Sequence, residues 1–579
     1  MKQANSDYDI VIVGGGIAGI YTAWRLIMAD KSDPSILKKW KKKSKLRIAV
    51  FEGSDRIGGR LLSATPPGFN SEMDCELGGM RFVSTQKYVS SLIINRLKIG
   101  HPLQAVGEAI NIIYMRRKLL RNYQLCDPDA LPYNITEEER LALKSGGTTA
   151  DNFLGWAVLK LIPGMAGLSG DALQAYLQTV VINGIPLYQH GFWDLVSKVL
   201  SHEAYTIAIN AVGYDVLGSN TNAVNCIAEY FDFTPTAQFY LVDGSYDVVP
   251  WTLQKQFEEA GGKVITRKWL DDFDEVQLED KTKGVELRFH KEKKPVNASA
   301  LVLAMPLRSL ELLRQTGPVM DPDRAPQLRS MMNSISPIGL FKMVLVYDQP
   351  WWEKKAYVTK GRSLTDLPVR QLYYWGVEQD PATGNQGKAV LMAYNDSVST
   401  TFWSGFRTEA LGPDDDQDEN SIGHPRHVML HQKAVMFKRK SLLNEKTAAK
   451  KIPKDPWLAL KRKNWDDHPA PKRMLEEMHR EIMEMHGVTD APLPIDAAFK
   501  NWGDDPYGAA VHFWNIGYKS WEVMPAMIKP VKDFPCYICG EAWSENQTWA
   551  EGSLQTAELL LQNHFGLSEP DWLTTTSTK

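Results

Sequence analysis

The sequence predicts an α/β protein, and three apolar segments lead to this fold class. The first is Ile10–Val13, which runs straight into the glycine-rich turn Gly14–Gly19 and then into an apolar-periodic helix, Ile20–Ala29. The second is the short run Arg47–Phe51, and the third is Ala300–Met305. Short apolar strands that lead into helices through tight turns are typical of α/β proteins.

The composition is that of an ordinary globular protein. The chain has 579 residues, of which 44% are apolar and 23% charged, so a collagen-like or mostly disordered chain is excluded. No run reaches about 18 consecutive apolar residues, so a membrane-spanning helix is not expected. The polar N-terminus lacks an apolar signal segment. We therefore expect a cytoplasmic protein, with membrane-peripheral and secreted locations left open.

The glycine turn has the spacing of a dinucleotide site. Gly14 makes the turn, Gly16 lets the backbone approach a pyrophosphate, and Gly19 lets the helix pack on the strand. The phosphate would then lie on the unsatisfied N–H groups at the helix start, which includes Ile17 and Ala18. This turn predicts a bound dinucleotide.

Downstream residues indicate which dinucleotide is bound. Glu52 ends the second strand, and its carboxylate suits the two hydroxyls of an adenosine ribose. It lies farther from the turn than usual, and we attribute the excess to an insertion at Lys31–Lys45. Two glycine–arginine elements follow, Gly58–Arg60 and Gly78–Arg81. A nicotinamide site needs one phosphate turn, so these elements indicate a longer, buried cofactor.

A third motif, Cys539–Ser553, lies near the C-terminus. With the two N-terminal motifs, it resembles the flavin amine oxidase family, and within it the L-amino acid oxidases. The motifs span Tyr8 to Glu558 in the family's order. The resemblance implies FAD and an α/β fold with three parts: a discontinuous Rossmann-like FAD-binding domain of the GR2 type, a mixed-sheet substrate-binding domain and a helical lobe.

The resemblance also predicts domain boundaries. The FAD-binding domain takes residues 1–85, 240–310 and 500–579, the helical lobe 86–239, and the substrate-binding domain 311–499 with a basic helical insertion at about 424–473. Within the insertion, His427–Leu443 has the pattern of a basic amphipathic helix, which we expect to pack on the lobe. Contact with a membrane surface or a partner is the alternative, and no nucleic acid is expected.

For FAD, the resemblance implies contacts from all the motifs. The expected residues are Gly14, Gly16, Ile17, Ala18, Gly19, Glu52, Gly58, Gly59, Arg60, Gly79, Met80, Arg81, Val264, Gly540, Glu541, Trp549, Gly552 and Ser553. Among them, the backbone of Val264 would contact adenine, and Glu541 would bind the ribityl or pyrophosphate region. No metal site is expected.

For the substrate, the resemblance gives Arg81 the role of binding a carboxylate. A guanidinium suits this role because it donates two parallel hydrogen bonds. Side chains alternate along a strand, so one of Tyr373 and Tyr374 on the expected strand Arg370–Trp375 should reach the site. The family match favours Tyr374 as the second carboxylate donor. A substrate carboxylate argues for an amino acid.

Further site residues follow from the resemblance. Lys342, unusual within an apolar strand, is the expected catalytic residue and would hold a water beside the flavin. Trp514 and Trp549 are the expected aromatic walls. Thr548 stands where the family commonly has glycine, so a branched side chain enters the substrate site. His512 is expected to have a structural role rather than that of a general base.

The expected function is an FAD-dependent L-amino acid oxidase, which converts an L-amino acid and O2 to a 2-oxo acid, ammonia and hydrogen peroxide. An amino acid 2-monooxygenase, a polyamine or monoamine oxidase, and a flavin-stabilised scaffold with a partner-binding insertion remain alternatives. A homodimer is the expected assembly. The CxxC pair Cys536 and Cys539 is interpreted as two structural thiols, because no second Cys/His pair lies near it.

Overall fold

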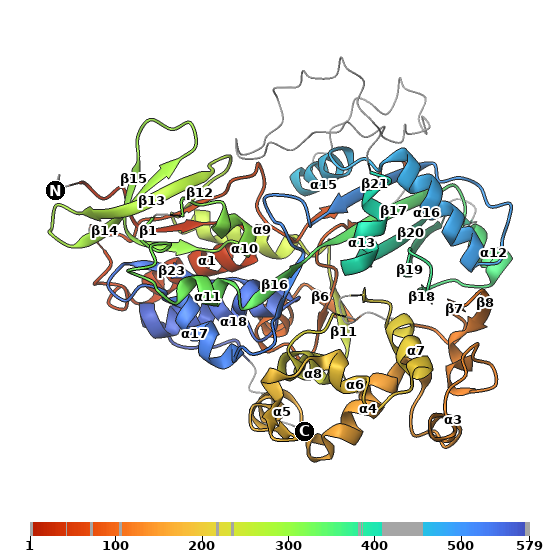
Figure 1. The fold of residues 1–579 in the computed structure, drawn as a ribbon. Helices are drawn as coiled ribbons and strands as arrows, with labels where there is room; N and C mark the ends of the chain where they lie inside the picture. The colour runs from red at the N-terminus through yellow and green to blue at the C-terminus, as the bar shows by residue number, and fades with distance from the viewer. Residues whose placement is uncertain are drawn as a thin grey trace, which may run out of the picture.

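The computed structural model describes residues 4–573 except 42, 70–72, 103–106, 216–218, 233–236, 316, 380–383, 385 and 408–454. Two large sheets lie side by side, and a helical region lies below them in the view of Figure 1. The expected amphipathic helix at 427–443 lies outside the described residues. Within the part of the chain that is described, no helix is long and apolar enough to cross a bilayer.

The first sheet collects strands that lie far apart in the sequence. Its order is β12-β2-β1-β15-β14-β13, with β23 also paired to β15. The strands are β1 (Tyr8–Val13), β2 (Ile48–Phe51), β12 (Lys263–Ile265), β13 (Leu270–Gln277), β14 (Lys283–Phe289), β15 (Val296–Leu303) and β23 (Cys536–Ile538). The pairs β12–β2, β2–β1, β1–β15 and β15–β23 are parallel, whereas β14 pairs antiparallel with both of its neighbours.

Helices cover both faces of this sheet because the side chains of β1 alternate between two cores. Ile10 and Ile12 pack in one core, and Val11 and Val13 pack in the other. The first core includes α1 (Ile17–Ser32), α9 (Val248–Glu259) and α18 (Ala550–Leu560), and the second includes α10 (Leu307–Glu311), α11 (Leu328–Met332) and α17 (Ser520–Ile528). The arrangement is a sheet between two helical layers.

The second sheet is mixed, with the order β21-β17-β20-β19-β18-β7-β8. Its strands are β7 (Ile112–Met115), β8 (Lys118–Arg121), β17 (Leu340–Tyr347), β18 (Gly361–Thr365), β19 (Gln371–Gln379), β20 (Gln386–Asp396) and β21 (Asp496–Asn501). One face packs on α12 (Trp351–Ala356), α13 (Ser397–Ser404) and α16 (Lys472–Met485). The other face packs on the residues around β3 (Ser63–Ala64) and β4 (Cys75–Glu76), which connects this sheet to the N-terminal segment.

The helical region has a core of its own, which includes Phe153, Phe192 and Trp193. It contains α3 (Glu137–Lys144), α4 (Phe153–Leu161), α5 (Gly170–Leu177), α6 (Phe192–Val196), α7 (His202–Val212) and α8 (Ala223–Asp232). A small sheet in the order β5-β11-β6 lies where the chain enters and leaves this region. Its strands are β5 (Phe82–Val83), β6 (Gly100–Pro102) and β11 (Phe239–Val242).

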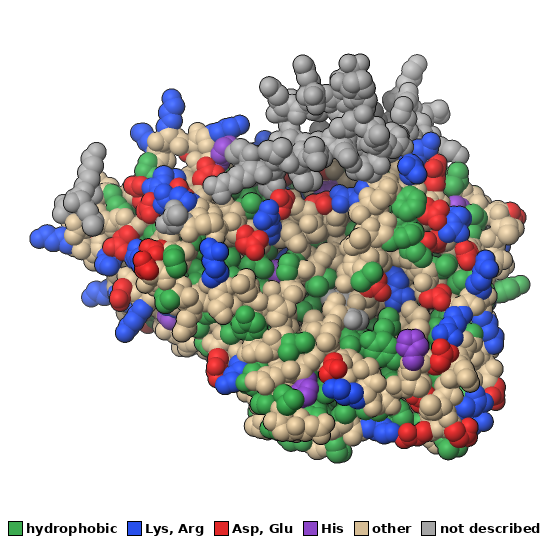
Figure 2. All heavy atoms as spheres, viewed as in Figure 1, with side chains coloured by type: hydrophobic (Ala, Val, Ile, Leu, Met, Phe, Trp, Pro, Cys, Tyr) green, Lys and Arg blue, Asp and Glu red, His purple; other side chains and the backbone are tan. Residues whose placement is uncertain are grey.

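The remaining elements are short or connect the parts already described. They are α2 (Lys87–Ser90), β9 (Val181–Ile182), β10 (Ile185–Pro186), β16 (Ile335–Ile338), α15 (Pro456–Asp466) and β22 (Val511–Trp514). Trp457 of α15 stacks on Trp251 of α9 with the ring centroids 4.6 Å apart, which anchors α15 to the first sheet's helices. On the face shown in Figure 2, acidic and basic side chains are interspersed over the described surface.

Candidate functional site

A cavity of about 810 Å³ lies at the carboxyl end of the parallel strands. Its wall includes Val13 at the end of β1, Glu52 just after β2, Ala304 just after β15 and Gly540 after β23. Ligands of parallel α/β sheets bind at this edge because the strand ends and the loops that follow them converge there. The volume falls within the range of about 300–1,000 Å³ that is usual for cofactor and ligand sites.

Most of the residues predicted to bind the cofactor line this cavity. They are Gly14, Gly16, Ile17, Ala18, Glu52, Gly58, Gly59, Arg60, Gly79, Gly540, Glu541, Trp549 and Ser553. Five others, namely Gly19, Met80, Arg81, Val264 and Gly552, are not part of the cavity wall. The sequence motifs therefore converge in space, although not every residue in them faces the cavity.

Two of the glycines outside the wall have a steric role behind it. A Cβ on Gly19 would lie 1.9 Å from the carbonyl oxygen of Gly14, so α1 could not pack on the turn. A Cβ on Gly552 would lie 2.0 Å from Ser544 Oγ. Val264 lies on β12 and packs against the core under the first sheet, away from the cavity.

The turn between β1 and α1 has the properties of an anion site. Gly14 has φ +111°, and a Cβ there would lie 2.2 Å from Ala304 O. α1 has no side-chain cap and no acidic residue in its first turn, so its N–H groups are available to a phosphate. Glu52 accepts a 2.6 Å hydrogen bond from Gly15 N. A cradle of glycines, a helix start and this carboxylate together fit the adenosine diphosphate half of FAD.

A buried ionic network lies at the other end of the cavity, around Glu541. Arg60 Nη1 and His512 Nδ1 each lie 2.9 Å from Glu541 Oε2, and the backbone N–H groups of His512 and Thr548 donate to Oε1. Burial acts to raise the pKa of Glu541, but the charges of Arg60 and His512 and these hydrogen bonds outweigh it, so the pKa falls to about 2. The carboxylate is therefore ionised at neutral pH, and His512 is part of its support.

A second charged cluster surrounds Arg81, beside the cavity. The side chain of Arg81 is buried, and its Nη2 donates a long 3.4 Å hydrogen bond to the hydroxyl of Tyr214. The guanidinium carbon lies 4.5 Å from the ring centroid of Phe239 and 5.8 Å from that of Tyr373. Nη1 is buried and has no hydrogen-bond partner among the described residues. A buried cation with an unsatisfied donor is a site for an anion, because leaving it unpaired is costly.

Lys342 is completely buried on β17 between this cluster and the cavity. Its Nζ donates a 2.5 Å hydrogen bond to Gly78 O and lies 5.0 Å from the ring centroid of Tyr394, and both of these residues line the cavity. Burial lowers the pKa of Lys342, the carboxylate of Glu76 partly offsets this effect, and Arg81 lowers the pKa further. An amine poised in this way can hold or release a proton near neutral pH.

The structure does not bring Tyr374 together with Arg81, contrary to the sequence prediction. Its hydroxyl lies 2.7 Å from His486 Nε2 and 2.8 Å from Ser363 Oγ, in the core on the other face of β19. Because side chains alternate along a strand, Tyr373 takes the face toward Arg81. The prediction that one of the two tyrosines lies near Arg81 agrees with the structure, but that residue is Tyr373, and the prediction of Tyr374 was wrong.

The structure also places Trp514 away from the cavity. It is buried in the core, and its indole N–H donates a 2.8 Å hydrogen bond to Ser544 O, so it is a packing residue and not an aromatic wall. Trp549, in contrast, lines the cavity, as does Thr548. Thr548 has φ +72°, a conformation that favours glycine, and its hydroxyl donates to Glu229 Oε1 at 2.7 Å.

Three residues of the Arg81 cluster were not predicted from the sequence. Tyr394 lies on β20, and its position opposite Lys342 depends on the pairing of β17 with β20. Tyr214 lies between α7 and α8 of the helical region, Phe239 begins β11, and no local motif marks either residue. Only the alternation on β20 and the knowledge of its partner strand would have indicated Tyr394.

Comparisons with known proteins identify the family of this chain. Residues 17–412 match the family described as flavin containing amine oxidoreductase. The chain is 23% identical to Aplysianin-A of Aplysia kurodai over 97% of its own length and 91% of that protein. It is 23% identical to Achacin of Lissachatina fulica, over 69% of this chain and 71% of the relative. It is 21% identical to the L-amino-acid oxidase of Demansia vestigiata, over 65% and 64% respectively. Because the family match covers more than half of the chain, the protein belongs to the flavin containing amine oxidoreductases, and FAD is its cofactor.

Proposed function

We propose that the protein is an FAD-dependent oxidase of L-amino acids, which produces a 2-oxo acid, ammonia and hydrogen peroxide. The observation that carries this proposal is the buried guanidinium of Arg81, whose Nη1 has no partner among the described residues. An amine or polyamine has no carboxylate to occupy such a position. An α-amino acid has one, next to the carbon that is oxidised. The relatives named as L-amino-acid oxidases support this choice.

The substrate carboxylate is proposed to bind Arg81 together with the hydroxyl of Tyr373. Hydrogen bonds from a charged donor to a carboxylate are short and strong, and the fork of a guanidinium fixes the orientation of the acceptor. A carboxylate held in this way orients the Cα–H bond relative to the cavity. When bound, FAD supplies the acceptor for the hydride that leaves Cα.

Lys342 is proposed to hold a water molecule and to accept a proton from it. Its hydrogen bond to Gly78 O fixes Nζ at the cavity wall, and burial favours its neutral form. A neutral amine can accept a proton from the water that converts the imino acid to the 2-oxo acid. The side chain of Thr548 and the ring of Trp549 border the same cavity and limit the room for the substrate side chain.

The proposal includes the division of the chain into domains that the sequence predicts. The first sheet, with residues 1–85, 240–310 and 500–579, is proposed to be a Rossmann-like FAD-binding domain of the GR2 type. Residues 311–499 would form the substrate-binding domain and residues 86–239 the helical lobe. In support, the strands of the first sheet come from these three segments, and the cavity lies at its carboxyl edge.

The test is anaerobic reduction of the flavin by a panel of L-amino acids. We expect at least one L-amino acid to bleach the flavin spectrum, while its D-enantiomer and spermine leave it unchanged. In air the same substrate should yield peroxide, ammonia and a 2-oxo acid. Bleaching by spermine alone, or the formation of an amide and carbon dioxide, would contradict the proposal.

A further inference from the structure

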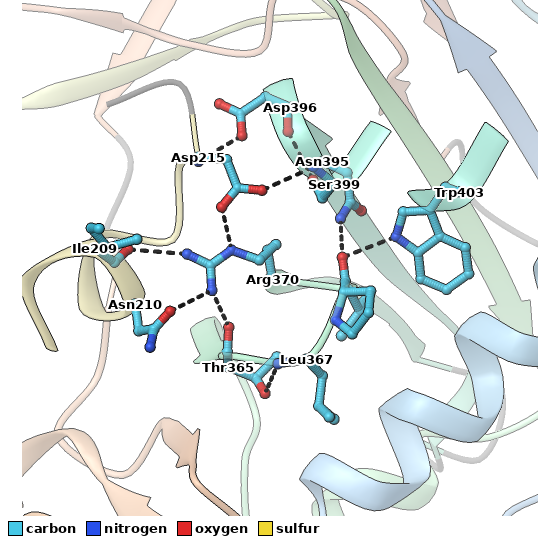
Figure 3. Close-up of polar contacts among 12 residues, drawn as sticks. Ile209, Asn210, Asp215, Thr365, Leu367, Arg370, Asn395, Asp396, Ser399 and Trp403 are labelled. Carbon is cyan, nitrogen blue, oxygen red and sulfur yellow. Dashed lines mark hydrogen bonds and ion pairs between the residues drawn. The ribbon is translucent and has the colours of Figure 1, made fainter. Parts of the chain in front are cut away.

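We propose that Tyr214, which follows α7 of the helical region, is a second hydroxyl of the substrate-carboxylate site, and that the buried ion pair Arg370–Asp215 fixes it opposite Tyr373 (Figure 3). This inference rests on the proposed function. Tyr214 then binds the substrate, while Arg370 and Asp215 are positioning residues that act through it.

Tyr214 contacts three of the residues in the Arg81 cluster, namely Arg81, Tyr373 and Tyr394. Its hydroxyl accepts from Arg81 Nη2 at 3.4 Å and lies 3.1 Å from the hydroxyl of Tyr373. Its ring packs edge-on against Tyr394 with a centroid distance of 5.4 Å. Tyr214 therefore brings a phenol from the helical region to the same point as the phenols of β19 and β20.

The number of donors shows what this cluster can bind. The two hydroxyls of Tyr214 and Tyr373 carry two hydrogens, and the bond between them uses one. Arg81 Nη2 donates to Tyr214, so it uses an acceptor and no hydroxyl hydrogen. One hydroxyl hydrogen and the Nη1 group of Arg81 remain. Nη1 carries two N–H groups, so with the hydroxyl hydrogen the cluster has at least three unused donors, enough for both oxygens of a carboxylate.

The ion pair next to Tyr214 is tightly defined. Arg370 is 5% exposed, and its Nε donates to Asp215 Oδ1 at 2.7 Å. Figure 3 shows that the other donors of the guanidinium reach the carbonyls of Thr365 and Ile209 and the side chain of Asn210. One guanidinium thus ties the end of α7 to the turn that precedes β19.

Asp215 is held from the sheet side as well. Its backbone N–H donates to Asp396 Oδ1 at 2.8 Å, and its Oδ2 accepts from the N–H of Ser399 at 3.1 Å (Figure 3). Asp396 ends β20, two residues after Tyr394. Asp215 therefore has three restraints, two on its carboxylate and one on its backbone N–H, and a shift of the chain at Tyr214 would disturb them.

The positions of Arg370 and Asp215 in the sequence explain how this ion pair fixes Tyr214 and Tyr373. Asp215 directly follows Tyr214, and Arg370 precedes Tyr373 by three residues. The ion pair therefore fixes the backbone next to Tyr214 and three residues before Tyr373. Gly213, with φ +80°, turns the chain into this position, and a Cβ there would lie 2.5 Å from Leu364 Cδ2. The ion pair joins the helical region to the second sheet at the carboxylate site.

The first experiment removes one hydroxyl. Tyr214→Phe should raise the KM for the best L-amino acid substrate about 10-fold, since a hydrogen bond to a charged group is lost, and should leave kcat and the flavin content nearly unchanged. The KM for the amide of the same amino acid, which lacks the carboxylate, should not change. Tyr205→Phe, whose ring packs on Trp193 within the helical region, is the matched control and should alter neither constant.

The second experiment tests the ion pair. Asp215→Asn and Arg370→Lys should each raise the KM for the acid more than that for the amide, and Asp215→Asn should add little in a Tyr214→Phe background, because the two changes act through one group. Equal effects on acid and amide, or full additivity, would overturn the positioning role. If Arg81→Lys also leaves the ratio of acid to amide unchanged, the proposed function itself fails. If Tyr214→Phe leaves the ratio of acid to amide unchanged while Arg81→Lys alters it, the inference about Tyr214 fails and the proposed function stands.

Discussion

Tyr373 and Tyr374 are neighbouring residues of the same type, but on β19 their side chains lie on opposite faces of the sheet. Tyr374 donates to His486 Nε2, because Nδ1 of that ring is bonded to Ile482 O and burial lowers the pKa of His486 to about 4, which keeps the ring neutral. Its hydroxyl is fully used inside a core. Tyr373 faces a guanidinium with an unpaired nitrogen.

This difference gives a prediction for two adjacent substitutions. Tyr373→Phe should raise the KM for an L-amino acid about 10-fold with little loss of stability. Tyr374→Phe should leave the KM unchanged and lower the free energy of unfolding by about 1–3 kcal/mol, because the buried His486 loses its donor. Steady-state kinetics and urea unfolding on both variants check it, and a reversed pattern would contradict the assignment of faces.

Glu541 makes a pH-dependent contribution to stability. Its pKa in the folded protein, about 2, lies below its ordinary value of 4.5, so the ionised form is stabilised by folding. The contribution is complete above about pH 4.5 and is lost as the pH falls toward about 2, and it amounts to up to about 3 kcal/mol.

Glu541→Gln should therefore be less stable than the original protein at about pH 6, and the gap should narrow at about pH 3. Urea unfolding of the FAD-loaded protein at both pH values measures this. Glu522→Gln, in an exposed pair with Lys519, is the control and should show no such convergence. A gap that is constant with pH would exclude the proposed ionic role of Glu541.

Individual residues of the cofactor site could be predicted from the sequence where local geometry dictates the residue type. Gly14 lies at a positive φ that the turn requires, and Glu52 directly follows β2, a strand that periodicity identifies. Trp514 and Tyr374 were placed wrongly because the facing of a side chain depends on which strand packs where, and a single sequence does not contain that information. Tyr214 was not foreseen, since its position is set by Asp215 and a partner far along the chain.

At the scale of elements, the β1–α1 turn allows the sharpest test. Gly14→Ala would place a Cβ 2.2 Å from Ala304 O, on a backbone with φ +111°. We expect the variant to lose bound flavin and several kcal/mol of stability.

The ratio of flavin to protein absorbance after purification measures this effect. Gly405→Ala is the matched control: no positive φ is required there, and the added Cβ would meet Phe402 O at an ordinary 3.6 Å. Normal flavin content in Gly14→Ala would show that the turn does not hold the pyrophosphate.

The strands were easier to predict than their partners. The expected strands Ile10–Val13, Arg47–Phe51 and Ala300–Met305 overlap β1, β2 and β15, and α1 extends the expected helix by a few residues at each end. Short apolar runs between turn residues carry this information locally. The pairing of β23 with β15, and the order of the second sheet, depend on contacts between distant segments and could not be derived from periodicity.

At the scale of the whole molecule, the cavity is formed by segments from both ends of the chain. Its wall runs from Val13 to Ser553, and α15, anchored by the Trp457–Trp251 stack, adds Lys463 and Asn464 to it. The second sheet and the helical region meet at Arg81 through Tyr373 and Tyr214, so the proposed substrate site depends on the relative placement of these two parts. Tyr214 belongs to the helical region, whereas Tyr373 and Tyr394 belong to the second sheet.

The late position of β23 has a consequence for biosynthesis. A ribosome produces β1, β2 and β15 well before Cys536–Ile538, which completes the parallel sheet from its outer side. Gly540, Glu541 and Ser553 emerge later still. The complete cavity for FAD can therefore form only after the residues up to Ser553 have been translated, and until then apolar surface of the nascent chain is exposed.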